Sequence, residues 1–217
     1  MEFIMPELID KHRSYGQHIQ FSDSIIFITW RLAFTLPKHL LVLYDEFIKE
    51  VNVKEKDLNK EDQKKHHAFL LQRYREYDLE LGKHQQPGIF LNEAEIAGII
   101  SNAFHFFDGA RYELHAWCIM SNHVHVLLRA LQNKDGEYYL ISSIIQSLKR
   151  FTANKINQVK GRQGQVWDDF YFDRIIRNIS DYQNVVNYIL HNPVAAGLID
   201  SADKWRDSYI NSRFVLH

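Results

Sequence analysis

The sequence predicts an α+β fold in which an antiparallel sheet carries helices packed on one face. Stretches rich in β-branched and aromatic residues predict strands over 24–35, over 111–119 and from His123 onward. Apolar residues at helical spacing predict helices over 91–107 and 138–159. With a helical insertion after the first strand, this order of elements is typical of ferredoxin-like and RRM-like sheets.

The composition is that of one globular domain. The chain has 217 residues, of which 46% are hydrophobic and 24% charged, and its net charge is -1. Any nucleic-acid binding would therefore depend on local patches. Cys118 is the single cysteine, which excludes an intramolecular disulfide and a thiolate zinc cage. Without a signal peptide or a membrane-length apolar run, we expect one cytoplasmic domain over residues 1–217.

The first half of the chain changes character twice. Residues 1–22 show little periodicity and predict an irregular arm, whereas 24–35 predicts a central strand because both of its faces are mostly apolar. From about 38 to 89 a helical pattern returns, interrupted by a run of mixed charges over 54–65. We expect a helical insertion with solvated faces, whose role (DNA contact or subunit interface) the sequence leaves open.

The second half supplies helices and a further strand. Asn92 is the expected N-cap of the helix over 91–107. Residues 171–177 predict a strand, and Ser180 to Gln183 reads as a capping box that opens another helix. Pro193 and then Gly197 are expected to mark the end of that helix.

Two histidines alternate with valine in the strand that begins at His123. His123 and His125 share one face, with Cβ atoms about 6.5–7 Å apart, while Val124 faces the core. Two imidazoles at this spacing can hold one metal ion. A strand that carries two histidines for no functional reason explains the pattern equally well.

The helix over 181–192 has an unusual polar face. Asp181, Asn184, Tyr188 and Asn192 gather there at the 3.6-residue period. A packing tyrosine is expected on the apolar face, and Asn192 lies one turn from Tyr188.

The stretch between Glu137 and Asp168 contains no acidic residue. It carries five cations: Lys149, Arg150, Lys155, Lys160 and Arg162. A local excess of this kind is a candidate footprint for a nucleic-acid backbone. A solvated helix followed by a basic loop is the alternative interpretation.

Taken together, these motifs resemble the single-tyrosine HUH transposases, and within them the REP-associated tyrosine transposases. The motifs are His123-Val-His125, Tyr188-Ile-Leu-His-Asn192-Pro-Val-Ala-Ala-Gly197, and Trp167 followed by Tyr171-Phe-Asp-Arg174. The resemblance runs through 25–37 and from about 92 to 205, and leaves out the charged insertion. The family commonly has Met-Pro-Asn before its histidines, where this chain has Met-Ser-Asn.

The resemblance implies a metal-dependent nucleophilic mechanism. His123, His125 and Asn192 would bind Mg²⁺ or Mn²⁺, and Tyr188 would form a 5′-phosphotyrosine link with DNA. The ion would polarise the scissile phosphate. No unambiguous base for the phenol is evident, and His191 is a weak candidate.

The implied substrate is single-stranded DNA beside a hairpin or repeat, bound by a monomer or a homodimer. Phosphate contacts are expected from four cations: Lys149, Arg150, Arg174 and Arg177. Trp30 and Arg31 are weaker candidates.

Two other functions remain open at this stage. One is a metal-dependent hydrolase whose site combines Glu113 and His115 with the histidine pair, since Glu113, His115 and Trp117 are expected to share a face of their strand. The other is a non-catalytic module that binds single-stranded nucleic acid, because a sheet backed by helices also suits base stacking.

Overall fold

The computed structural model describes residues 8–13, 17–34, 36–51, 60–84 and 88–214. Its centre is a five-stranded antiparallel sheet with the order β6-β3-β5-β4-β7. The strands are β3 (Ile25–Arg31), β4 (Tyr112–Ile119), β5 (His123–Ala130), β6 (Phe172–Ile175) and β7 (Ser208–Ile210). The predicted central strand is confirmed, because β3 lies between β5 and β6.

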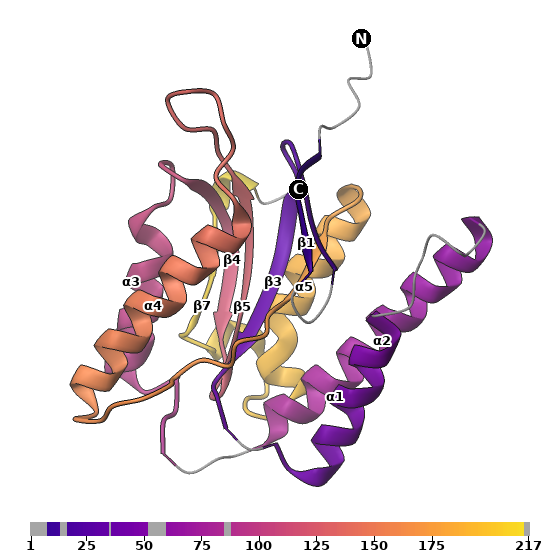
Figure 1. The fold of residues 1–217 in the computed structure, drawn as a ribbon. Helices are drawn as coiled ribbons and strands as arrows, with labels where there is room; N and C mark the ends of the chain where they lie inside the picture. Colours follow the sequence, from indigo (N-terminus) through magenta and orange to yellow (C-terminus); the bar gives the residue numbers. More distant parts are fainter. Residues whose placement is uncertain (1–7, 14–16, 35, 52–59, 85–87, 215–217) are drawn as a thin grey trace.

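One face of the sheet is covered by α3 (Ala94–Phe106) and α4 (Ile141–Val159), as predicted (Figure 1). Every second residue of β5, including Val124 and Val126, packs into this core. The N-cap of α3 is Glu93 rather than the predicted Asn92. Phe90 donates its backbone N–H to the Glu93 carboxylate, so this acid side chain turns back towards the preceding loop instead of the helix.

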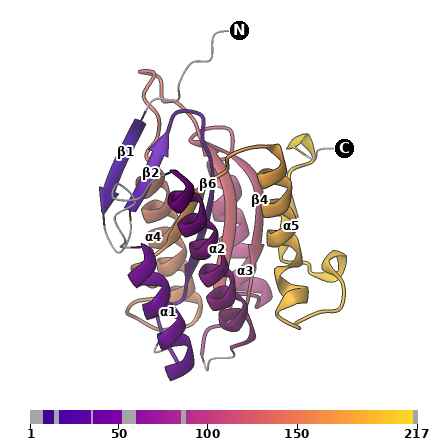
Figure 2. The ribbon, with the colours of Figure 1, turned by 90° about the vertical axis from the view of Figure 1, so that its right-hand side faces the viewer.

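The opposite face of the sheet is also covered, by α5 (Ile179–Ala195) and by the two helices that follow β3. These are α1 (Lys38–Val51) and α2 (Lys60–Lys83), which lie in the stretch predicted as a helical insertion. Figure 2 shows α2 in front of the sheet. Phe27 and Leu127 on this face of the sheet pack with Tyr74 of α2 in one apolar cluster, which also includes residues of α1 and α5. The histidine face of β5 is therefore sealed by helices.

The helices α2 and α5 approach closely at Gly82. A Cβ atom built at Gly82 would lie 3.1 Å from the Cβ of Ala196 and 3.7 Å from Oδ1 of Asn192. Any larger side chain would push the two helices apart.

The N-cap of α5 and the place of Pro193 both differ from the prediction. Its N-cap is Asn178, whose side chain accepts from the backbone N–H of Asp181 at 2.9 Å, so the predicted cap at Ser180 is wrong by two residues. Gly197 ends the helix with φ 73°, as predicted. Pro193, which was predicted to mark the same end, lies inside the last turn, so that part of the prediction is wrong.

Residues 8–13 and 17–21 do not form an irregular arm, so that prediction is wrong for the part of the N-terminal segment that the structure describes. In it β1 (Leu8–Arg13) and β2 (Gln17–Phe21) form a separate two-stranded antiparallel sheet. The Gln20 side chain fixes this sheet to the start of α4, since it donates to the Tyr139 carbonyl and accepts from the Ile141 N–H, both at 2.9 Å. These strands are defined by their backbone hydrogen bonds. Their residues show little hydrophobic periodicity from which the strands could be predicted.

The predicted hairpin of β4 and β5 is present, but β4 contains a bulge. The register shifts between Leu114 and Ala116, with His115 as the extra residue. Beyond the bulge the faces exchange, and Trp117 packs into the α3–α4 side of the core. The prediction that Glu113, His115 and Trp117 share one face is therefore wrong. No helix among the described residues is long and apolar enough to cross a membrane.

Candidate metal centre and nucleophile

The two histidines of β5 converge at their Nε2 atoms. His123 Nε2 and His125 Nε2 lie 3.1 Å apart, and both side chains are fully buried. Two nitrogen ligands that each lie about 2.0–2.1 Å from one ion are separated by about 3.0–3.4 Å. The pair therefore has the spacing of two ligands of a single metal ion.

Both imidazoles are held at their other ring nitrogen. Nδ1 of His123 lies 2.7 Å from Oδ1 of Asn122, and Nδ1 of His125 lies 2.8 Å from Oγ1 of Thr29. The Asn122 amide nitrogen donates to the Leu81 carbonyl at 2.8 Å, so its oxygen must face His123. His123 then carries its proton on Nδ1 and turns an Nε2 lone pair towards the centre, as in most histidine metal ligands.

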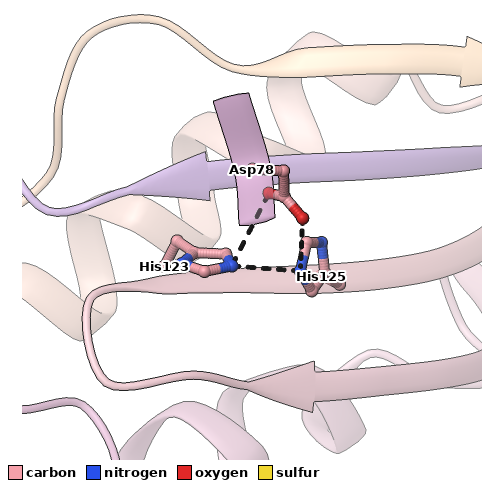
Figure 3. Close-up of side chains that lie close together, drawn as sticks. All are labelled: Asp78, His123 and His125. Atoms are coloured by element: carbon pink, nitrogen blue, oxygen red, sulfur yellow. Dashed lines mark hydrogen bonds and ion pairs between the residues drawn. The ribbon is translucent and has the colours of Figure 1, made fainter. Parts of the chain in front are cut away.

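A buried carboxylate completes the centre. Asp78 of α2 places Oδ1 3.6 Å from His123 Nε2 and Oδ2 3.5 Å from His125 Nε2 (Figure 3). The ligand atoms of the three residues lie within 4.8 Å of one another. Two imidazoles and a carboxylate form a donor set that can hold a divalent metal ion.

Helix α2 positions Asp78 through an aromatic stripe. Tyr74, Tyr77 and Leu81 lie on the same side of the helix and are buried. The Tyr74 ring stacks on Phe172 with ring centroids 3.9 Å apart, and its hydroxyl donates to Thr29 Oγ1 at 2.7 Å. These contacts dock the helix against β3 and β6.

Asp78 is the member of the candidate site that was not found from the sequence. The mixed charges of α2 favoured a solvated helix, and a carboxylate there attracts no attention. The signal was its position within the stripe Tyr74, Tyr77 and Leu81, where every other member is apolar or aromatic. A single acid on a stripe that faces the core has to find a cation or hydrogen-bond donors.

Helix α5 brings Tyr188 and Asn192 to the same carboxylate. The Tyr188 hydroxyl donates to Asp78 Oδ2, and Asn192 Nδ2 donates to that oxygen at 2.8 Å. The remaining Asn192 oxygen, Oδ1, is buried and has no hydrogen-bond partner among the residues that the structure describes. The structure thus brings His123, His125, Tyr188 and Asn192 together around Asp78.

The protonation states of Asp78, His123 and His125 are those needed to bind a metal cation. Burial raises the pKa of the Asp78 carboxyl, but the attraction that His125 and His123 exert when they are protonated and the hydrogen bonds from Tyr188 and Asn192 outweigh this, so the pKa is lowered. Burial lowers the pKa of His123 to about 3 and also lowers that of His125, which keeps both rings neutral. The centre therefore combines one anion with neutral imidazoles.

The phenol of Tyr188 is held in its protonated form. Burial, followed by the adjacent Asp78 charge, raises its pKa well above 10.0, whereas the Arg75 guanidinium acts in the opposite direction. Attack by this oxygen therefore needs a proton acceptor in contact with it. Asp78 is in contact, whereas His191 is exposed and its Nδ1 lies 2.9 Å from the Asn187 carbonyl.

The cations predicted to contact DNA from α4 lie on the opposite side of the sheet from His123 and His125. Lys149 and Arg150 line a groove between α4 and the segment 164–171, on the side of the sheet opposite to the histidines. The Lys149 ammonium lies 3.3 Å from the Asp169 carbonyl, and burial lowers its pKa to about 8. Lys160 forms an ion pair with Glu93 at 2.6 Å. The basic stretch is thus partly neutralised in the fold, while Arg150 remains exposed.

The cations near the start of α5 differ in availability. Arg174 forms two hydrogen bonds with the Asp181 carboxylate, at 2.9 and 2.7 Å, whereas the Arg177 side chain is exposed. The two weaker candidates for DNA contact lie mostly inside the protein. Trp30 is only 3% exposed, and Arg31 forms an ion pair with Asp168 at 2.6 Å.

The alternative hydrolase cluster does not form. His115 lies under α5, with Nδ1 3.1 Å from the Tyr182 hydroxyl and its ring stacked on Phe214. Glu113 forms an ion pair with Arg129 at 2.6 Å. Within the described part of the chain, the carboxylate that joins the histidine pair comes from α2 instead.

Comparison with known proteins gives this centre a context. Residues 93–192, which include both histidines, Tyr188 and Asn192, match the family described as "Transposase IS200 like". This segment resembles the IS200-like transposases. The similarity to REP-associated tyrosine transposases that the motifs indicate is confirmed by the relatives, and Asp78 lies outside the matched segment.

Two curated relatives carry the REP-associated name. A Haemophilus influenzae protein, provisionally named a REP-associated tyrosine transposase, is 26% identical over 99 residues, which cover 43% of this chain and 56% of that protein. The Escherichia coli REP-associated tyrosine transposase is 26% identical over 94 residues, covering 43% of this chain and 52% of that protein. The chain thus matches little more than half the length of either relative.

One solved structure, of a REP-associated tyrosine transposase bound to a REP hairpin, is also similar. It shares 16% identity with a TM-score of 0.46, and the alignment covers 92% of this chain and 81% of that chain.

Proposed function

We propose that this protein is a transposase that cleaves and rejoins single-stranded DNA next to a hairpin, through a 5′-phosphotyrosine at Tyr188. One observation carries the proposal. A tyrosine hydroxyl and an amide on α5 meet two converging histidines and a carboxylate in one buried cluster, and a simple packing tyrosine would not need these partners.

The nucleophilic step follows from the position of the Tyr188 hydroxyl. Its oxygen attacks the scissile phosphorus, the new Oη–P bond forms, and the P–O3′ bond breaks to release a 3′-hydroxyl. The phenol proton passes by way of Asp78 Oδ2, to which it is already hydrogen-bonded, to the departing O3′, so that the carboxylate is unprotonated again when the 3′-hydroxyl leaves. In the joining step a 3′-hydroxyl attacks the phosphotyrosine and the tyrosine recovers its proton. The covalent link conserves the energy of the phosphodiester, so no nucleotide cofactor is needed.

The residues present fit a divalent metal ion such as Mg²⁺ or Mn²⁺. The ligands would be His123 Nε2, His125 Nε2 and an Asp78 oxygen, and the unpartnered Oδ1 of Asn192 is a further oxygen donor within the same cluster. Such an ion would supply Lewis-acid polarisation of the scissile phosphate. Asn122 and Thr29 would keep the imidazoles oriented towards it.

The DNA would be held mainly through its backbone. Arg150 and Arg177 are exposed and ready to contact phosphates, whereas Lys149 and Arg174 would first have to exchange their present partners, the Asp169 carbonyl and the Asp181 carboxylate. Because the α4 cations and the histidine centre lie on opposite sides of the sheet, a DNA that reached both would have to pass around its edge.

The direct test is a covalent adduct. Wild-type protein is incubated with a single-stranded oligonucleotide that carries a hairpin and flanking single strand, in the presence of Mn²⁺ or Mg²⁺, and is then resolved by denaturing electrophoresis. We expect a protein–DNA species that resists SDS, disappears in Tyr188→Phe, and is lost when the metal is chelated.

The matched control is Tyr182→Phe, which removes another hydroxyl from the same helix. Tyr182 contacts His115 rather than the metal centre, so its adduct should form as in the wild type. Adducts that persist in Tyr188→Phe, or that never form with any hairpin substrate, would refute the nucleophile. Retained DNA binding without any adduct would instead support the non-catalytic binding module.

A further inference from the structure

Tyr188 is where the candidate site reaches the protein surface. Asp78, His123 and His125 are fully buried and Asn192 is 4% exposed, whereas Tyr188 keeps intermediate exposure. A DNA strand that reaches the nucleophile therefore has to approach along the exposed side of the Tyr188 ring. What lies on that side decides how the strand is received.

The Arg75 guanidinium lies over the Tyr188 ring. Its central carbon is 6.0 Å from the centroid of the Tyr188 ring, and the side chain is exposed. Arg75 forms no ion pair within the described part of the chain. Its neighbour two positions back, Arg73, is paired with Glu46 and Glu76 at 3.5 and 3.0 Å. Arg75 is thus an uncommitted cation beside the nucleophile.

The surface around Arg75 is an open groove along one face of α2. It is lined by Ala68, Leu71, Gln72, Arg75, Glu76 and Leu79. Glu76, the acid in this lining, accepts from both Gln72 and Arg73, so its charge is already matched. Apolar side chains along the groove offer a surface for sugars and bases, and a single cation offers a contact for phosphate.

We propose that Arg75 binds a backbone phosphate of the DNA strand next to the scissile one and thereby positions the strand over Tyr188. The inference rests on the proposed function and deepens it, because it assigns substrate binding to the α1–α2 insertion. An exposed arginine suits this task, since its planar guanidinium can bind two phosphate oxygens at once. The contact does not depend on base identity and would serve any sequence at the site.

The test measures the salt dependence of DNA binding without chemistry. In a Tyr188→Phe background, the dissociation constant for a mixed-sequence single-stranded oligonucleotide with a hairpin is measured between about 50 and 200 mM NaCl. Removing one phosphate contact in Arg75→Ala should weaken binding about three- to tenfold and reduce the slope of log K against log salt by about 0.7. Arg75→Lys should keep most of the slope, because the charge is retained.

Arg73→Ala is the matched control, since it removes an arginine from the same helix whose charge is already paired. Its slope should equal that of the background. An unchanged slope in Arg75→Ala, with binding intact, overturns the role of Arg75 and leaves the proposed function standing. Failure of the background protein to bind any hairpin oligonucleotide overturns both. Binding that responds to Arg75, with no adduct in the wild type, refutes the chemistry alone.

Discussion

Replacing Asp78 by asparagine tests whether the carboxylate is a metal ligand. The side chain keeps its shape and one oxygen that can accept from Tyr188 or Asn192, so the hydrogen-bonded cluster persists while the charge is lost. The measured quantity is the shift in melting temperature that Mn²⁺ produces in each protein. Comparing each protein with and without metal removes any effect of Asp78→Asn on intrinsic stability.

The expected magnitude follows from linkage. At a Mn²⁺ concentration about 100 times the dissociation constant, the wild type gains about 2.7 kcal/mol of unfolding free energy. A hundredfold loss of affinity, about what removing a charged ligand should cost at minimum, leaves about 0.4 kcal/mol at that concentration. For a chain of this size, the corresponding rise in melting temperature falls from about 5–10 °C to about 1 °C.

Glu80→Gln is the control for that experiment. Glu80 lies on the same helix, two positions on, and pairs with Lys83 at the surface. Its Mn²⁺-induced shift should match that of the wild type. A full shift in Asp78→Asn would show that the carboxylate is no ligand. Its remaining roles would then be to hold Tyr188 and Asn192 and to accept the phenol proton in the proposed reaction.

Two further predictions concern stability. Burial lowers the pKa of His115 from 6.5 to about 4, so the unfolded chain binds the extra proton between these values. The unfolding free energy should therefore fall by roughly 3 kcal/mol as the pH drops from 6.5 to about 4. When unfolding by denaturant is measured over the same pH range, His115→Phe should lack this decrease. Trp167 donates to Thr152 Oγ1 at 2.8 Å inside the core, so Trp167→Phe should lower the unfolding free energy by about 1–3 kcal/mol, whereas Phe151→Leu on the exposed side of α4 should change it little.

Local periodicity was enough to predict four of the five residues of the candidate site, all except Asp78. Strand alternation correctly places His123 and His125 on one face, and the helical period correctly puts Tyr188 and Asn192 one turn apart. These statements concern residues within a single element, where the backbone geometry alone decides which side chains are neighbours. The same reasoning located β3, α3 and α4.

The features that could not be predicted from the sequence depend on contacts between elements that are distant along the chain. The packing of α2 on the sheet, which delivers Asp78, has no local signature beyond one acid on an aromatic stripe. The bulge at His115 likewise follows from pairing with β5, and one extra residue exchanges the faces of everything beyond it. The pairing of β1 with β2 is a third case.

The hydrogen bond between Tyr188 and Asp78 spans 110 positions of the chain. During synthesis the carboxylate emerges first, the two histidines follow, and the tyrosine comes last. A nascent chain would therefore contain the three proposed ligands before the proposed nucleophile. Under the proposed function, DNA cleavage would become available only after α5 has been made and has packed against α2. The order of elements along the polypeptide would thus tie a potentially damaging reaction to the completion of folding.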